Sequence, residues 1–341
     1  MTLFLDILAF LFGLVLIVKG ADWLTDGAAN IAHRFHIPTL VIGLTIVAIG
    51  TSAPEFVVSL MGALRHSPDI AIGNVVGSNI FNILAIIGCT ALVAPITMTR
   101  SNVLRDLPIM VISTFALFFM LIDKYLDSTA TGNSLTRGDG LVLLCLFSMF
   151  MYYTMRMGKK GRKQANAQKE EVHFTELPAW LPNFFKQHSL LTNIVMILLG
   201  LACLVYGGDT MVGGASGIAR SLGVSEAIIA LTIVSIGTSA PELATSIMAA
   251  HKGDHAMVVG NIVGSVVFNT LLILGASALV CPLPMTGITM IDLYVLLGAS
   301  VLIWLDSKFG RGHYTITRME GAIMVLLQIG YYVYLVIQEG I

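Results

Sequence analysis

The sequence has few charged side chains. Only 11% of its 341 residues are Asp, Glu, Lys or Arg and 56% are hydrophobic, whereas an ordinary soluble domain carries roughly 25% charged residues. So few ionisable groups cannot cover the surface of a soluble fold of this length, and the mean hydropathy of +0.86 points the same way. The composition therefore excludes a soluble enzyme, a nucleic-acid-binding protein and a disordered chain, and it predicts a polytopic membrane protein.

Cysteine and the motifs of hydrolytic enzymes are also scarce. The four cysteines lie in or beside apolar stretches, which is typical of small buried side chains rather than of disulfides or metal ligands. The chain has neither the G-x-x-x-x-G-K loop that binds nucleotide phosphates nor the H-E-x-x-H motif of zinc proteases. We therefore expect no enzyme activity and no covalent cofactor, so that an ion gradient must drive any transport.

Long apolar runs fill most of the chain. A membrane-spanning helix needs about 20 predominantly apolar residues. The first run is read as a retained span, because no basic segment precedes it and no small-residue cleavage site follows it. Asp22 and Asp209 fall at the ends of the first and sixth runs, where we expect them to act as anchors; capping and ion binding at a vestibule are the alternatives. The predicted fold class is all-α and polytopic, with ten transmembrane helices near 3–22, 38–65, 70–94, 103–122, 138–157, 190–209, 225–250, 257–280, 286–305 and 319–338.

One long polar connection, 158–188, separates five expected spans from the other five. It holds a cluster of lysines interrupted by glutamates, which favours a solvated linker over a nucleic-acid-binding patch. If the N-terminus lies outside, most of the Lys and Arg residues fall in inside loops, as the positive-inside rule requires. The sequence therefore predicts that both termini lie outside and that the linker is cytoplasmic.

The two parts of the chain repeat each other. The segment Gly50–Glu55, G-T-S-A-P-E, recurs as Gly237–Glu242, and Gly73–Ser78, G-N-V-V-G-S, recurs as Gly260–Ser265. The offset is constant, because 242 − 55 and 265 − 78 both give 187. An odd number of spans in each part inverts the second copy in the bilayer. The predicted organisation is a first five-helix repeat at 1–157, the linker at 158–188, and a second, inverted five-helix repeat at 189–341.

Each hexapeptide predicts a break within its span. Pro54 has no N–H, and its ring clashes with the carbonyl four residues earlier, at Gly50. The second span should therefore break midway and free carbonyl oxygens near 48–50, and Pro241 should break the seventh span in the same way. In transporters, broken helices at membrane depth are where ions are held.

The glutamates of the hexapeptides have two interpretations. Ser52 and Glu55 fit the S-x-x-E capping box, so one interpretation is that Glu55 serves only to cap the second half of its helix. Capping, however, needs no carboxylate, and an ionisable residue at a helix centre costs roughly 2.5–3.5 kcal/mol on insertion scales. Because Glu242 repeats that cost at the equivalent point of an inverted repeat, the pair favours a shared central site.

A polar stripe follows each break. Asn74, Ser78 and Asn82 are four residues apart and so share one face of the third span, and the eighth span repeats the three residue types. Interhelical hydrogen bonding is the alternative role, worth about 1 kcal/mol or less for each amide. That alternative is strongest for Asn74 and its counterpart Asn261.

All of these donor groups are oxygen atoms. Such sites suit hard cations, and Ca²⁺ takes about 6–8 oxygen ligands. Two ionised glutamates carry a charge of −2, which one Ca²⁺ or two Na⁺ neutralise, whereas three Na⁺ would leave +1. A site that one divalent ion or several monovalent ions can fill, but not both together, is a physical basis for exchange. The oxygen donors are two Glu carboxylates, two Asn carbonyls, freed backbone carbonyls, and the hydroxyls of Thr51, Ser52, Ser78, Thr238, Ser239 and Ser265.

The two G-T-S-A-P-E segments, each followed by G-N-x-x-G-S-x-x-F-N, resemble the two alpha repeats of the calcium/cation antiporter superfamily. The similarity covers nearly the whole chain and is greatest to the prokaryotic sodium/calcium exchanger branch. It implies ten transmembrane helices in inverted five-helix halves, an ion site at mid-membrane between spans 2, 3, 7 and 8, and alternating access by sliding of spans 1 and 6. It also implies a prokaryotic cytoplasmic (inner) membrane.

The resemblance also implies roles for individual residues. Glu55 and Glu242 would be the central calcium ligands, the six hydroxyl residues would form sodium sites around them, and Asn82 and Asn269 would complete the ring. Some family members have aspartate at the position of Asn269 or of Glu242. Both asparagine positions are neutral here, so the site charge is −2 rather than −3, which weighs against potassium dependence. Val266 is another departure, because the first repeat has Asn79 there.

We therefore expect a secondary antiporter that exports Ca²⁺ against inward Na⁺, with membrane lipid around it and no obligatory protein partner. Three alternatives remain open. Protons could replace sodium, because burial disfavours the charged form of a carboxyl group; potassium could be co-transported; or a ring of carboxylates could line a passive cation channel. A purely structural membrane scaffold would have no use for the paired glutamates.

Overall fold

The structure, a computed structural model, describes residues 2–64, 68–126, 132–168, 190–221, 235–285, 288–310, 312 and 314–338. It is almost entirely helical. Within the described residues, eight helices are long and apolar enough to cross a membrane, or nine if one bent pair is counted as a single span. The all-α polytopic class is therefore confirmed. The expected seventh span, 225–250, lies partly outside the described residues, which resume at 235.

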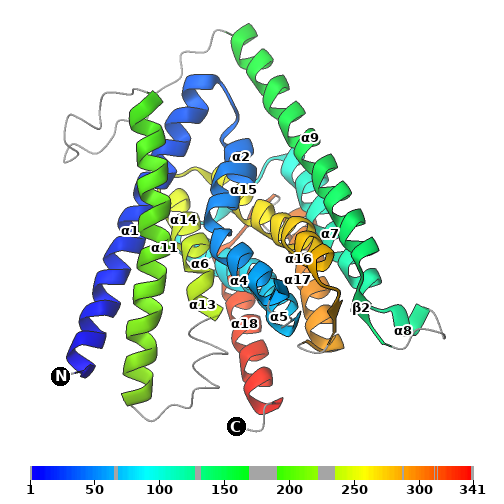
Figure 1. Cartoon of the computed structure of the whole chain (residues 1–341). Coiled ribbons are helices and arrows are strands. Elements are labelled where there is room, and N and C mark those ends of the chain that lie inside the picture. The colour runs from blue at the N-terminus through cyan, green and yellow to red at the C-terminus, as the bar shows by residue number, and fades with distance from the viewer. Residues whose placement is uncertain are drawn as a thin grey trace.

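The first half of the chain begins with the long helix α1 and ends with the long helix α9 (Figure 1). Its span 2 is divided among four short segments, and its span 3 among three. The elements are α1 (Thr2–Phe35), α2 (Thr39–Ile42), η1 (Gly43–Val47), α3 (Ala48–Thr51), α4 (Ala53–Leu64), α5 (Pro68–Phe81), η2 (Asn82–Ile86), α6 (Ile87–Val93), β1 (Ile96–Thr97), η3 (Asn102–Asp106), α7 (Leu107–Met120), α8 (Asp123–Leu126), β2 (Ser134–Leu135) and α9 (Arg137–Gln168), where η denotes a π-helical segment.

The second half of the described chain begins with the long helix α11 and ends with α18. Span 8 is divided like span 3, with a π-helical segment between two α-helices. The elements are α11 (Leu190–Ser221), α13 (Ser235–Thr238), α14 (Ala240–His251), α15 (His255–Val267), η5 (Phe268–Ile273), α16 (Leu274–Val280), β3 (Leu283–Pro284), α17 (Met290–Phe309), β4 (Thr315–Ile316) and α18 (Arg318–Gln338).

Three predicted boundaries were wrong. Helix α1 continues to Phe35 and α11 to Ser221, so Asp22 and Asp209 lie inside long helices rather than at the ends of their spans. Helix α9 continues to Gln168, so the first residues of the predicted linker are helical; the rest of the linker, 169–188, lies outside the described residues. Hydropathy marks the apolar part of a helix, but a helix does not stop where its side chains become polar.

Helices α1 and α11 form an antiparallel pair at one flank of the molecule (Figure 1). Glycines allow their backbones to meet: a Cβ atom on Gly20 would lie 2.7 Å from the Gly200 carbonyl oxygen, and one on Gly207 would lie 2.9 Å from that of Gly13. Small residues of this kind let membrane helices approach closely. Direct backbone contact at these glycines is therefore one feature of the interface.

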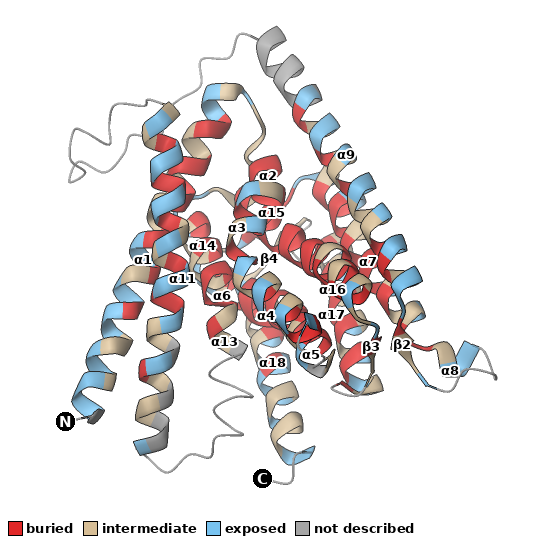
Figure 2. Cartoon of the chain, in the orientation of Figure 1, coloured by how far each residue is buried: buried red, intermediate tan, exposed pale blue. Residues whose placement is uncertain are grey.

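The segments α5–η2–α6 and α15–η5–α16 form the centre of the fold. Both are largely buried, whereas α1, α9, α11 and α18 expose much of their surface (Figure 2). The exposed side chains on the outer helices are mostly large and apolar, for example Phe12, Met149, Leu198 and Leu326. Such a surface is suited to lipid, so the outer helices face the bilayer and the central ones hold the buried polar residues.

Contacts in one half have counterparts in the other. Strand β1 pairs antiparallel with β4, and β2 pairs antiparallel with β3. Similarly, Gly88 of α6 meets the backbone of α18 at Gly321, while Gly140 of α9 meets that of α16 at Gly275. These four contacts all cross between the two halves and join them into one body.

Candidate functional site

Two helices are broken at equivalent points. The first break is at Ser52, between α3 and α4, where the chain bends by 51°. The second is at Ser239, between α13 and α14, and a proline stands in the first turn of the helix that follows. The predicted breaks are therefore confirmed. One detail was wrong: the Ala48 carbonyl is not freed, because it accepts a hydrogen bond from the Ser52 N–H at 3.0 Å.

The serines at the breaks reach across to the opposite half. Ser52 Oγ donates to Glu242 Oε1 at 2.8 Å, and Ser239 Oγ donates to Glu55 Oε1 at 3.2 Å. The Ser239 side chain makes no hydrogen bond that caps its own helix. The capping box therefore does not account for the two glutamates, since each carboxylate takes its serine partner from the other repeat.

Both carboxylates are deeply buried and close to each other. Glu55 is 0% exposed and Glu242 is 1% exposed, and the two are near enough to interact electrostatically. Thr238 lies on the Glu55 side, whereas Thr51 and Ser265 lie on the Glu242 side. Two like charges in so confined a space repel each other, and a bound cation would relieve that repulsion.

Several buried polar atoms around the glutamates have no partner among the described residues. A buried polar atom without a hydrogen bond costs free energy, so a group of them calls for an explanation. Ser78 of α5, which precedes Asn82 by four residues and shares its helix face, is buried but is not one of these unpartnered residues. The unpartnered atoms are Glu55 Oε2, Glu242 Oε2, Ser265 Oγ, Asn269 Oδ1, and both amide atoms of Asn82.

The first asparagine of each polar stripe has a bracing role. Asn74 Nδ2 donates to the Glu55 backbone carbonyl at 3.2 Å and to Ser59 Oγ at 2.9 Å. Asn261 Nδ2 donates to the Glu242 carbonyl at 3.3 Å and to Ser246 Oγ at 3.0 Å. These amides hold the backbone of each broken helix where its glutamate is attached. The interhelical hydrogen-bonding interpretation thus applies to both residues.

The last asparagine of each stripe lies in a π-helical segment. Asn82 begins η2, which packs against the Glu242 helix α14, and Asn269 lies in η5, which packs against the Glu55 helix α4. π-Helical turns are rare and often occur at functional sites. These segments were not predicted, because neither composition nor spacing signals a π turn.

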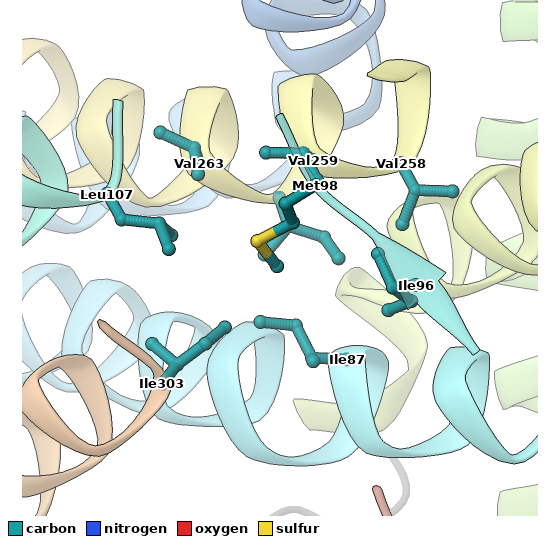
Figure 3. Close-up of a pocket in the computed structure, with 9 residues that line it drawn as sticks. Ile87, Ile96, Met98, Leu107, Val258, Val259, Val263 and Ile303 are labelled. Carbon is teal, nitrogen blue, oxygen red and sulfur yellow. The ribbon is translucent and has the colours of Figure 1, made fainter. Parts of the chain in front are cut away.

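The set of donors defines what the site is able to bind. In the part of the chain that the structure describes, no group of three or more His, Cys, Asp or Glu side chains is placed to hold a metal ion. A cation between the halves would therefore be held by two carboxylates and by neutral oxygens. A separate small cavity between β1, α6, α15 and α17 is lined only by aliphatic side chains and Met98, so it offers no ligands to a cation (Figure 3).

Broken helices around buried acids define this molecule as a polytopic membrane protein of the kind that transports ions. The sequence profile of the family described as sodium/calcium exchanger protein matches residues 5–156 and 192–338. The chain belongs to that family.

Relatives of known sequence and structure agree with this assignment. The chain is 37% identical over 323 residues to the putative antiporter CaxA of Alkalimonas amylolytica, covering 94% of this chain and 95% of that one. It is 29% identical to the sodium/calcium exchanger MaX1 of Methanosarcina acetivorans, covering 97% and 98%. A solved structure of the sodium-calcium exchanger NCX_Mj, soaked with zero Na⁺ and Ca²⁺, superposes with a TM-score of 0.79 at 29% identity, covering 98% and 99%.

Proposed function

We propose that the protein is a secondary antiporter that exchanges Ca²⁺ for Na⁺ across the membrane, with Ca²⁺ held between Glu55 and Glu242. The observation that carries the proposal is the set of buried oxygen atoms without partners that the two repeats contribute around one acidic pair. Two relatives, MaX1 and NCX_Mj, are named as sodium/calcium exchangers, which supports the same choice of ions.

The ligands fall into two groups in this proposal. Glu55 Oε2, Glu242 Oε2 and the carbonyl oxygens of Asn82 and Asn269 coordinate Ca²⁺, which prefers six or more oxygens. Sodium ions, which carry less charge and need fewer ligands each, use the hydroxyls near the two breaks. Because the carboxylates serve both ions, calcium and sodium exclude one another, and each must leave before the other binds. The hydroxyl ligands are Thr51, Ser52, Ser78, Thr238, Ser239 and Ser265.

We infer that the fold has ten spans in two inverted five-helix repeats, 1–157 and 189–341, joined by a cytoplasmic linker. The antiparallel pair α1 and α11 and the crossed strand pairs support this arrangement, because a two-fold relation between the halves generates both. Alternating access then occurs by sliding of α1 and α11 over the other helices. Their glycine interface supports a joint movement, since it brings the backbones of the two helices into direct contact.

Charge supports the proposed orientation, with both termini outside a prokaryotic cytoplasmic (inner) membrane. In that orientation Lys252, between α14 and α15, lies on the inner side, together with Arg34 and Lys308. A cysteine-labelling experiment tests it: in intact cells, an impermeant thiol reagent should label a cysteine introduced at Gly132, between α8 and β2, and not one introduced at Lys252.

Calcium flux in reconstituted vesicles tests the proposed function. Vesicles loaded with sodium should take up calcium when diluted into sodium-free medium, and should not do so when potassium or choline replaces the internal sodium. Uptake driven by a pH step without sodium would identify a proton-coupled antiporter instead, and a requirement for potassium would identify a potassium-dependent exchanger. Calcium currents through single open channels in a planar bilayer would contradict antiport altogether.

A further inference from the structure

A hydrogen-bonded chain connects the two central helices beside the proposed ion site. Asn79 Nδ2 of α5 donates to Thr270 Oγ1 of η5 at 2.9 Å, and Asn269 Nδ2 donates to Asn79 Oδ1 at 3.2 Å. All three side chains are 0% exposed. The chain ends at Asn269 Oδ1, which has no partner among the described residues. Asn79 therefore accepts a hydrogen bond from the amide nitrogen of Asn269, and the amide oxygen of Asn269 remains available to a ligand.

The direction of these hydrogen bonds decides which atom of the Asn269 amide faces the proposed ion site, because an amide has an oxygen at one end and an NH₂ group at the other. Its oxygen is able to coordinate a cation, whereas its NH₂ group donates hydrogen bonds and repels one. Reversing both amides would present Asn269 Nδ2 to the ion. Thr270 opposes that reversal, because its Oγ1 accepts a hydrogen bond from the NH₂ group of Asn79 and would face the Asn79 oxygen if the amide were turned. Threonines within helices commonly donate their own hydroxyl proton to a carbonyl of the preceding turn, which leaves Oγ1 as an acceptor. Thr51 and Thr154 both do so, donating to the carbonyls of Val47 and Phe150.

The equivalent asparagine of the first repeat has no such support. At the 187-residue offset, Val266 replaces Asn79 and Ile83 replaces Thr270, so neither member of the chain has a polar counterpart. Both amide atoms of Asn82 are buried and lack a partner among the described residues. The two asparagines are therefore unequal: one amide is held in a single orientation, and the other is free to turn.

We propose that Asn79, held by Thr270, is a positioning residue that keeps the Asn269 carbonyl oxygen directed at the bound cation. It does not touch the cation itself. This inference rests on the proposed function for the identity of the ion. It also makes the site asymmetric, because Asn269 of the second repeat is oriented before the ion binds, whereas Asn82 of the first repeat must be oriented by the ion when it binds.

Calcium uptake at varied calcium concentration tests the inference. In Asn79→Leu, which has nearly the same shape, the concentration for half-maximal uptake should rise by about three- to tenfold, the size expected for one buried hydrogen bond, while the maximal rate should change less than about twofold. Thr270→Val should show a smaller rise in the same direction, and Thr270→Ser should restore wild-type behaviour. Thr154→Val is the matched control, because it removes an equally buried hydroxyl that bonds only to its own helix.

A double variant separates positioning from general damage. If Asn79 acts only through Asn269, then Asn79→Leu should have less than about a twofold further effect in an Asn269→Ala background. Independent effects that multiply in the double variant would overturn the inference, and so would unchanged half-saturation in both Asn79→Leu and Thr270→Val.

A second measurement distinguishes failure of this inference from failure of the proposed function. The thermal stability of the purified protein is followed while Ca²⁺, Na⁺ or K⁺ is titrated. If the wild-type protein carries no calcium but a cation stabilises it, the antiport proposal fails. In that case a rise of about three- to tenfold, in Asn79→Leu, in the cation concentration that gives half-maximal stabilisation still supports the positioning role. A wild-type protein stabilised by no cation would overturn both.

Discussion

Replacing Glu242 by glutamine tests the acidic pair directly, and the structure indicates the size of the effect. Glutamine keeps the shape of the side chain and an oxygen to accept the Ser52 hydrogen bond. It places an NH₂ group at the position of Oε2, which is buried and open to the site. One anionic ligand thus becomes a hydrogen-bond donor, and the site charge falls from −2 to −1. Removing one partner of a buried charge pair costs about 3–5 kcal/mol, which corresponds to a loss of calcium affinity of about a hundredfold or more.

The assay is sodium-driven uptake of radioactive calcium into proteoliposomes at matched protein content. Glu242→Gln and Glu55→Gln should both abolish uptake at micromolar calcium while the protein still inserts and elutes as a single species. Asp292→Asn is the matched control, because Asp292 is also a buried carboxylate but serves the capping box at the start of α17. Near-normal exchange by both glutamine variants would refute the reasoning.

Three further perturbations follow from particular contacts. Asn82→Ala and Asn269→Ala should each weaken calcium uptake less than the glutamine variants do, because each removes a neutral ligand; equal or larger losses would show that the amides do more than supply an oxygen. Gly20→Ala should lower the thermal midpoint of unfolding and slow transport, since its Cβ would meet the backbone of α11, whereas Gly330→Ala, which faces open space, should change neither. Lys252→Met should lower the thermal midpoint in detergent by an amount equivalent to about 1 kcal/mol, because Lys252 Nζ lies 2.6 Å and 2.8 Å from carboxylates of α1; an unchanged midpoint would mean that this ion pair contributes nothing to stability.

The helical architecture was predictable because it follows from local properties. Apolar runs long enough for a bilayer correspond to α5–α6, α7, α15–α16, α17 and α18 within a few residues. The C-terminal ends of α1, α9 and α11 were not predictable, because those helices continue past their apolar runs into more polar sequence. The π-helical segments at Asn82 and Asn269 were not predictable either, because the residue types and spacing there are equally compatible with a regular α-helix.

The residues of the candidate site were predictable from the sequence, but the hydrogen bonds between them were not. Every oxygen-bearing residue that the repeats suggested lies on the broken helices or on the two central ones. Spacing places Asn74 and Asn82 on one stripe, and the sequence favours an interhelical role more for Asn74 than for Asn82. The structure separates them, since Asn74 braces the backbone at Glu55 and Asn82 is left without a partner among the described residues.

The sequence by itself determined that this is a membrane protein with two related halves, where each half breaks, and that two acids accompany the breaks. Those properties depend on hydrophobicity, on the missing N–H of proline and on residue identity, which act over a few turns of chain. Only the tertiary structure decided that each serine bonds to the glutamate of the other half, and that Asn269 is oriented while Asn82 is not. These contacts join residues 184 to 191 positions apart, and only the packing of the assembled helices brings such residues within hydrogen-bonding distance.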